Sequence, residues 1–106
     1  MKTYIIHMAI TALLIAGCSS PPDQPKTYTV EIKDMKFVPE AITVKKGDTV
    51  LWVNRDIMNH DVTEEKTKAW TSSPIKTGAS WKMAVTNDAN YYCSIHVVMK
   101  GTISVE

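Results

Sequence analysis

The chain has 106 residues, of which 12 are lysine or arginine and 11 are aspartate or glutamate. This length suffices for one small domain and leaves no room for two. The near balance of charge argues against nucleic acid as a partner, because nucleic-acid-binding domains are strongly basic.

The first segment has the pattern of an export signal. Lys2 precedes an apolar run from Tyr4 to Ala16, which is shorter than the roughly 20 residues that a membrane span needs and ends in small residues that suit a signal peptidase. Cys18, directly after Gly17, resembles the acylated cysteine of a bacterial lipobox, which becomes the first residue of the mature protein. An ordinary signal peptide that is cut nearby is the alternative.

We therefore expect three parts: a lipoprotein signal peptide (1–17), a lipidated Cys18 with a proline-rich tether (18–26), and a folded domain (27–106). The tether, Ser-Ser-Pro-Pro-Asp-Gln-Pro-Lys after Cys18, favours an extended, semi-rigid segment. The mature protein is expected to be anchored by lipid to a bacterial membrane and to face the periplasm or another extracytoplasmic side.

Beyond residue 27, apolar and polar side chains alternate with the period of a strand that buries one face. The alternating apolar positions are Tyr28, Val30 and Ile32; Ile42 and Val44; Val50 and Trp52; Trp81, Met83 and Val85; Tyr91 and Cys93; Ile103 and Val105. Turn residues separate these runs at spacings that suit an antiparallel sandwich. The charged stretch 61–69 fits a solvated loop or edge strand better than a helix. The prediction is an all-β sandwich with Trp52, Trp81 and Tyr91 in its core.

Near its end the chain places a thiol, an imidazole and a thioether on one short loop: Cys93, His96 and Met99. After signal removal, the remaining histidines are His60 and His96. Cys93 then has no disulfide partner in an oxidising compartment if Cys18 is lipidated, and metal ligation would protect it. One thiolate, two imidazoles and a weak axial thioether form the ligand set of a mononuclear copper site for electron transfer. The candidate ligands are His60, Cys93, His96 and Met99.

Other metal centres fit these residues less well. Structural zinc usually takes four cysteine or histidine ligands, whereas three are available. Iron–sulfur clusters generally need four thiolates, or two where histidines substitute. The dinuclear copper centre of cytochrome oxidase subunit II uses two cysteines on one loop, and multicopper oxidases use additional His-x-His pairs. Met35, Met58 and Met83 are interpreted as core filler or surface residues.

The chain resembles the cupredoxins, the small blue copper proteins. The spacing Cys93-x-x-His96-x-x-Met99 is similar to that of the amicyanins, and the segments 35–39, 42–50 and 52–54 resemble the first three strands of the family. The resemblance implies a Greek-key β-sandwich with one copper ion, cycling between Cu(I) and Cu(II), under one end. It places His60 on one ligand loop and the other three ligands on a second loop. It also implies a non-enzymatic carrier of single electrons between transiently bound redox proteins.

Two features depart from the family pattern. Ile95 and Val97 stand where many relatives carry prolines, so the loop lacks the stiffness that proline gives. We expect His96 to detach more readily on reduction and the reduction potential to depend on pH.

Asp61 stands where relatives commonly have an asparagine that bridges the ligand loops. Its carboxylate can accept hydrogen bonds from Ser94 but cannot donate, and it adds negative charge near the metal; a simple loop aspartate is the alternative.

The exposed edge of His96 is the expected electron port. An apolar patch is expected around it for brief docking, since weak electron-transfer encounters use small interfaces; the alternative is that some of its members point into the core. The patch residues are Met58, Ile95, Val97 and Val98.

We expect a monomer. Two other functions stay open: a lipid-anchored copper carrier or storage protein, and catalysis at an open copper position, which would require that Met99 does not bind.

Overall fold

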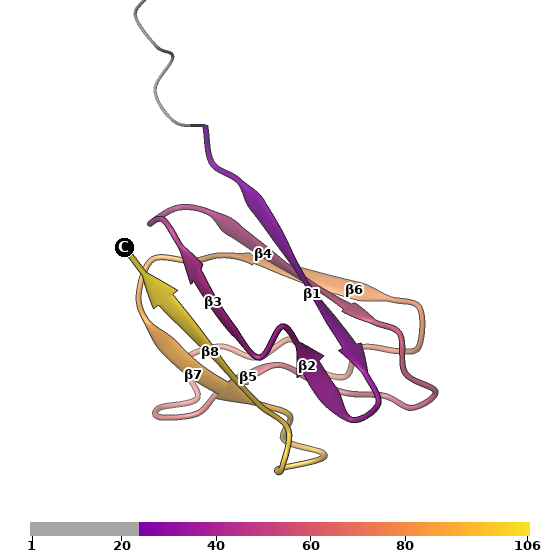
Figure 1. The fold of residues 1–106 in the computed structure, drawn as a ribbon. Coiled ribbons are helices and arrows are strands. Elements are labelled where there is room, and N and C mark those ends of the chain that lie inside the picture. The colour runs from indigo at the N-terminus through magenta and orange to yellow at the C-terminus, as the bar shows by residue number, and fades with distance from the viewer. Residues whose placement is uncertain (1–23) are drawn as a thin grey trace, which may run out of the picture.

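The structure is a computed structural model that describes residues 24–106, and these residues fold into eight strands (Figure 1). The strands are β1 (Thr27–Lys33), β2 (Lys36–Val38), β3 (Ala41–Val44), β4 (Thr49–Asn54), β5 (Thr63–Glu64), β6 (Ser80–Ala84), β7 (Ala89–Tyr92) and β8 (Lys100–Val105). The expected signal peptide and most of the expected tether lie outside the described residues. Within 24–106 there is no helix, so no helix there could cross a membrane. The all-β prediction is confirmed, including an edge strand within 61–69.

The strands form two stacked sheets, with the orders β2-β1-β4-β6 and β3-β8-β7-β5. Four of the pairings are antiparallel, but β1 pairs in parallel with β4, and β3 with β8. The expectation of an antiparallel sandwich is wrong for these two pairs. Neither pair is joined by a hairpin. After β1 the chain forms β2 in the same sheet, crosses to the other sheet as β3, and then returns to β4. Such crossover connections let paired strands run in the same direction. The spacing of turn residues in the sequence does not distinguish a crossover connection from a hairpin.

An aromatic cluster forms the centre of the core. Trp52 and Tyr91 are fully buried, and their ring centroids are 5.4 Å apart. Trp81 is partly buried and lies 5.5 Å from Trp52. Trp70, which the sequence did not single out, completes the cluster at 6.3 Å from Trp52. The two sheets are thus joined by large rings, whose burial is a major source of stability in a small domain.

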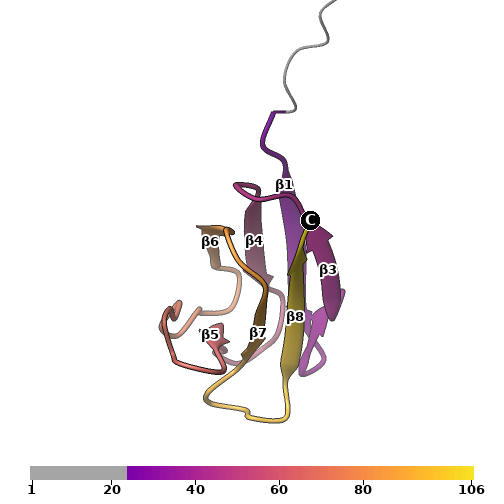
Figure 2. The same cartoon turned by 90° about the vertical axis from the view of Figure 1, so that its left-hand side faces the viewer.

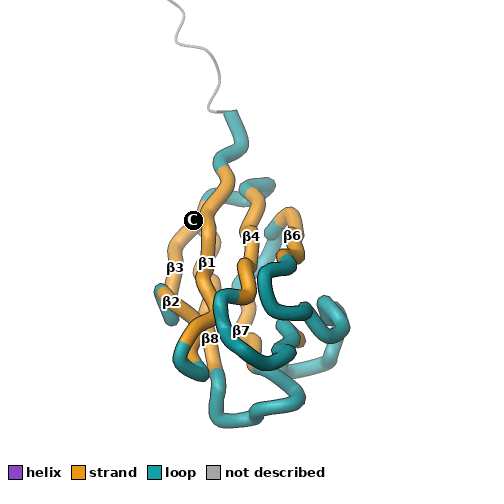
Figure 3. Tube along the Cα trace, turned by 90° about the vertical axis from the view of Figure 1, so that its right-hand side faces the viewer, coloured by secondary structure: helices purple, strands orange, loops and turns teal. Residues whose placement is uncertain are grey.

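Strand direction brings the functional loops to one end of the sandwich. The turn between β1 and β2, the loop after β4 and the loop between β7 and β8 all lie there, opposite the end where the chain enters β1 and where β8 finishes (Figures 1 and 2). Figure 3 shows loops gathered at this end below the strands. We call it the distal end and define it by residues 34–35, 55–60 and 93–99.

Candidate metal centre

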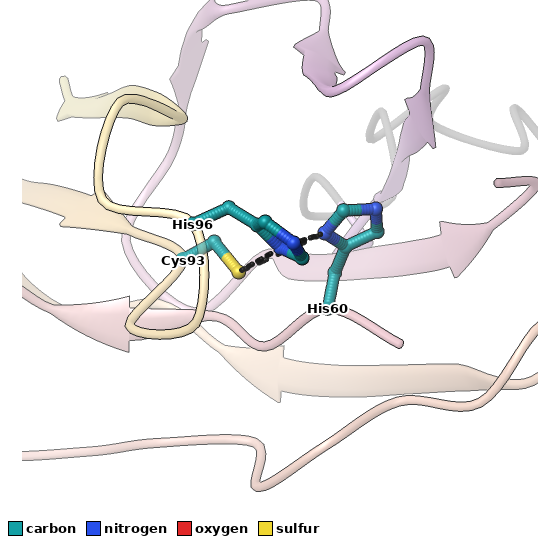
Figure 4. A group of neighbouring side chains, drawn as sticks. All are labelled: His60, Cys93 and His96. Atoms are coloured by element: carbon teal, nitrogen blue, oxygen red, sulfur yellow. Dashed lines mark hydrogen bonds between the residues drawn. The ribbon is translucent and has the colours of Figure 1, made fainter. Parts of the chain in front are cut away.

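At the distal end, the side chains of His60, Cys93 and His96 converge (Figure 4). The two histidine Nδ1 atoms are 3.1 Å apart, and each lies 3.8 Å from Cys93 Sγ. Bonds of about 2.0 Å to nitrogen and about 2.3 Å to sulfur, arranged at 120° in a plane, would give about 3.7 Å between nitrogen and sulfur and about 3.5 Å between the nitrogens. The observed triangle therefore matches the ligand plane of one small metal ion, and its donors are those that copper prefers.

The loop that carries His60 is folded around a buried side chain, Asn54, at the end of β4. Asn54 Nδ2 donates to the carbonyl oxygens of Met58, at 2.9 Å, and of Ile75, at 2.8 Å, while its Oδ1 accepts from the Asp56 N–H at 2.9 Å. His60 and Ile75 exchange backbone hydrogen bonds in an isolated bridge. These bonds hold the backbone of the loop that carries His60.

A carboxylate orients the ring of His60. His60 Nε2 lies 2.9 Å from Asp56 Oδ2 and can donate its proton there, which leaves the Nδ1 lone pair facing Cys93. The same carboxylate oxygen accepts from the Met35 N–H at 3.1 Å. The bond to His60, followed by the bond to Met35, lowers the pKa of Asp56 below its ordinary value. Such a partner fixes the tautomer of a histidine ligand and raises its basicity.

The sequence alone did not single out Asp56 as a partner of a ligand. An acidic residue four positions before a candidate histidine ligand was a visible signal. That spacing brings two side chains together in a helix, but in an irregular loop it has no fixed meaning. The role of Asp56 depends on the way residues 55–59 wrap around Asn54.

The second ligand loop is closed by its own backbone. The Cys93 N–H donates to the Met99 carbonyl oxygen at 3.1 Å, and the Met99 N–H donates to the His96 carbonyl oxygen at 3.0 Å. Cys93 is fully buried and Met99 is 2% exposed, whereas His96 is partly exposed. The structure therefore brings His60, Cys93 and His96 into one group and keeps Met99 buried at the end of the same loop. Two backbone bonds brace this loop although Ile95 and Val97 are not prolines.

Asp61 links the two ligand loops. Its Oδ1 accepts from the Ser94 N–H at 2.7 Å and from the Thr63 hydroxyl at 3.1 Å, and its Oδ2 accepts a short hydrogen bond from the Ser94 hydroxyl. Its backbone N–H points at Cys93 Sγ at 3.4 Å, where a donated bond stabilises negative charge on sulfur. Both contacts expected between Asp61 and Ser94 are present, and Asp61 is buried.

The expected patch residues are all exposed rather than buried in the core: Met58, Ile95, Val97 and Val98. Ile57, at 88% exposure, adds a further apolar side chain that the sequence analysis missed. These residues lie on the two loops that bear His60 and His96, so the partly exposed edge of His96 is flanked by apolar surface.

Comparison with known proteins supports a copper site in this position. A model of the family described as copper binding proteins, plastocyanin/azurin family, matches residues 25–106. The amicyanin of Paracoccus versutus is 29% identical over 99 residues, covering 87% of this chain and 72% of that protein. A solved Cu(I) structure of an amicyanin mutant is similar with a TM-score of 0.70 at 28% identity, over 76% of this chain and 82% of the other. A Cu-containing nitrite reductase from Thermus scotoductus SA-01 gives a TM-score of 0.69 at 25% identity, over 85% of this chain but 24% of the enzyme chain.

Proposed function

The chain belongs to the copper-binding proteins of the plastocyanin/azurin family, the cupredoxins, and we propose that it carries single electrons between redox proteins outside the cytoplasm. Its cofactor is one copper ion. The observation that supports the proposal is the triangle of two imidazole nitrogens and one sulfur, with separations of 3.1 and 3.8 Å, at one end of the sandwich.

We propose that His60, Cys93, His96 and Met99 would hold the copper ion. Copper supplies the one-electron couple when it is bound. The chain holds the ligand atoms in place: Asp56 orients His60, the Met99 carbonyl oxygen accepts from the Cys93 N–H, and the Asp61 carboxylate accepts from the N–H of the next residue, Ser94. Ligands that are fixed in advance need little rearrangement between oxidation states, which favours rapid electron transfer.

The proposed electron port is the exposed edge of His96. The apolar side chains beside it, Met58, Ile95, Val97 and Val98, would exclude water during a brief encounter with a donor or acceptor. We propose no catalytic role, because catalysis would need an open coordination position, which the proposed ligand Met99, buried at the end of the same loop, would fill. The likeness to nitrite reductase extends to only 24% of that enzyme chain.

The location rests on the sequence alone. We propose that residues 1–17 direct export, that Cys18 is lipidated, that the segment up to residue 26 links the lipid to the domain at 27–106, and that the protein is a monomer. Mass spectrometry of the protein isolated from membranes tests the lipidation: a diacylglycerol-modified N-terminal Cys18 is expected. An unmodified N-terminus produced by a nearby cut would contradict it and indicate an ordinary signal peptide.

A copper carrier or storage protein is the alternative. Carriers favour exposed sites from which metal is exchanged, whereas His60 and Cys93 are both 0% exposed. The deciding experiment is to load the protein with Cu(II) and record its visible absorption and electron paramagnetic resonance spectra together. An intense thiolate-to-copper band with compressed hyperfine splitting supports electron transfer. A weak band with ordinary hyperfine splitting would mean that Cys93 does not bind in the trigonal plane, and would favour the carrier.

A further inference from the structure

The turn between β1 and β2 holds two residues in a backbone conformation that L-residues seldom adopt. Lys33 pairs with Lys36 across the hairpin, so Asp34 and Met35 are its two turn residues. Their φ angles are 53° and 59°, and positive φ at both central positions is the property of a type I′ hairpin turn. Aspartate tolerates this region, whereas the second position usually holds glycine. Met35 therefore occupies a strained position that glycine would fit without strain.

This strained residue donates to the carboxylate that orients His60. The Met35 N–H points at Asp56 Oδ2 at 3.1 Å, and the same oxygen lies 2.9 Å from His60 Nε2. The other carboxylate oxygen accepts from the Ile57 N–H at 3.0 Å. Of the groups in the described part of the chain that donate to Asp56, Met35 is thus the one outside residues 55–60. It ties the carboxylate to the end of β1, at the same end of the sandwich as the loop after β4 (Figure 1).

The side chain of Met35 anchors the turn. It is partly buried and packs against the hydrophobic core. It also lines a surface groove together with Phe37 of β2 and the proposed ligand Met99. Burial of this apolar side chain is favourable and offsets the cost of the left-handed backbone. The packing of Met35 therefore keeps its N–H aimed at Asp56.

We propose that Met35 is a positioning residue of the copper site: the packing of its side chain holds its strained backbone in place, and its N–H thereby fixes Asp56 and, through Asp56, the ring of His60. This inference rests on the proposed copper-dependent electron transfer. It adds the turn between β1 and β2 to the two ligand loops as a third support of the site. Strained backbone persists where surrounding contacts over-determine it, and it clusters at functional sites.

Three substitutions of Met35 separate its side chain from its backbone. Met35→Leu keeps an apolar anchor, and Met35→Gly removes both the anchor and the strain, so both should keep the N–H on Asp56. Met35→Ala removes the anchor and leaves the strain, so the turn should relax and release Asp56. Copper affinity, measured by competition with a Cu(I) chelator, should fall by about tenfold in Met35→Ala. It should stay within about twofold of the wild type in the other two variants.

The ring of His60 can be followed without copper. Nitrogen-15 NMR of the metal-free protein, at a pH where the imidazole is neutral, shows which ring nitrogen carries the proton. The proton should reside on Nε2, the nitrogen that faces Asp56, in the wild type, Met35→Leu and Met35→Gly. Met35→Ala should show a mixture of the two tautomers, because a released carboxylate no longer selects one of them. A role of Met35 in stability alone would leave the tautomer unchanged.

Control variants separate positioning from a general loss of stability. Gly47 has a φ of 92°, and a Cβ there would meet nothing within 4 Å. Gly47→Ala, between β3 and β4 and outside the distal end, therefore adds backbone strain alone. It should lower stability in denaturant unfolding and keep the affinity and the tautomer. Asp34→Ala, which leaves the packing of Met35 intact, should also keep both. In an Asp56→Ala background, Met35→Ala should cause no further loss of affinity, because the two residues act through one contact.

Equal affinities in Met35→Gly and Met35→Ala would overturn the proposal, because the backbone preference of residue 35 would then not matter. Additive losses in the double variant with Asp56→Ala would contradict it as well. A mixture of tautomers in Met35→Gly would do the same, and that result does not depend on whether Met35→Ala folds. Failure of the proposed function looks different: the copper-loaded wild type would lack the intense thiolate-to-copper band, while the tautomer of the metal-free protein would still test the positioning of His60.

Discussion

A single carboxylate determines which nitrogen of His60 is free to bind metal. Asp56 accepts from Nε2, so its removal should let the ring rotate and change tautomer. Asp56→Ala is expected to weaken copper affinity by about 10- to 100-fold, measured by competition with a Cu(I) chelator. Asp56→Asn still offers an oxygen to Nε2–H and should keep most of the affinity. Asp34→Ala, at an exposed aspartate of the same end, is the control; equal affinities in all three variants would show that Asp56 does not position His60.

The charge of Asp61 is expected to favour Cu(II). Asp61 is buried and holds Ser94 through both carboxylate oxygens. Its negative charge should therefore act on the metal with little screening. Asp61→Asn removes the charge and should raise the reduction potential, measured by voltammetry of the copper protein. Asp88→Asn, at an exposed residue outside the distal end, should leave the potential unchanged. A potential that falls or stays constant in Asp61→Asn would contradict this role.

At the residue level, the sequence could suggest the ligand group because three of its members lie within seven positions of one another. The type and spacing of Cys93, His96 and Met99 need no knowledge of the fold. His60 was identified as the second histidine ligand because no histidine other than His60 and His96 remains after signal removal. The partners of these residues were harder to predict: Asp56 reaches His60 only because an irregular loop folds around Asn54.

At the level of the elements, close packing between β7 and β8 depends on a glycine. Gly101 pairs with Tyr91, and a Cβ at Gly101 would overlap Cζ and the hydroxyl oxygen of the Tyr91 ring. The ring is buried, and burial raises the pKa of Tyr91 to about 12. Gly101→Ala should reduce the free energy of unfolding by about 1–3 kcal/mol through overpacking, as measured by denaturant unfolding. The double variant with Tyr91→Leu should lose less than the sum of the two single effects; additive effects would contradict the overlap.

The turn after β5 should respond to acid. The Glu64 carboxylate accepts from the N–H groups of Lys66, Thr67 and Ala69 and from the Thr67 hydroxyl. The bond from the Thr67 N–H is the main cause that lowers the pKa of Glu64 from 4.5. The stabilisation is therefore present above pH 4.5 and is lost as the pH falls through the lowered pKa. Glu64→Gln should show a shallower loss of stability with acid than the wild type, followed by chemical unfolding across this range; identical slopes would exclude the effect.

The same turn shows what sequence patterns can predict about elements. Alternation located the six longer strands correctly because one face of each is buried or, in β6, partly buried. It could not show the turn that follows the two-residue strand β5, since that turn is held by several N–H groups that donate to one side chain, Glu64. Nor could it show that β1 lies parallel to β4, because pairing between distant strands depends on the path of the whole chain.

For the whole molecule, the distal end, with its two ligand loops, and the chain entry lie at opposite ends of the sandwich (Figure 1). The seven residues of β1 extend about 23 Å along it at about 3.3 Å per residue. If lipid is attached at Cys18, the distal end should therefore face away from the membrane and stay accessible to soluble partners. The lipidated copper protein bound to phosphatidylcholine vesicles should react with hexacyanoferrate(III) at nearly the rate of the protein freed from lipid by cleavage within residues 19–23. A reaction slowed about tenfold or more on vesicles would show that the membrane covers the distal end, and the electron port would then serve a membrane-bound partner.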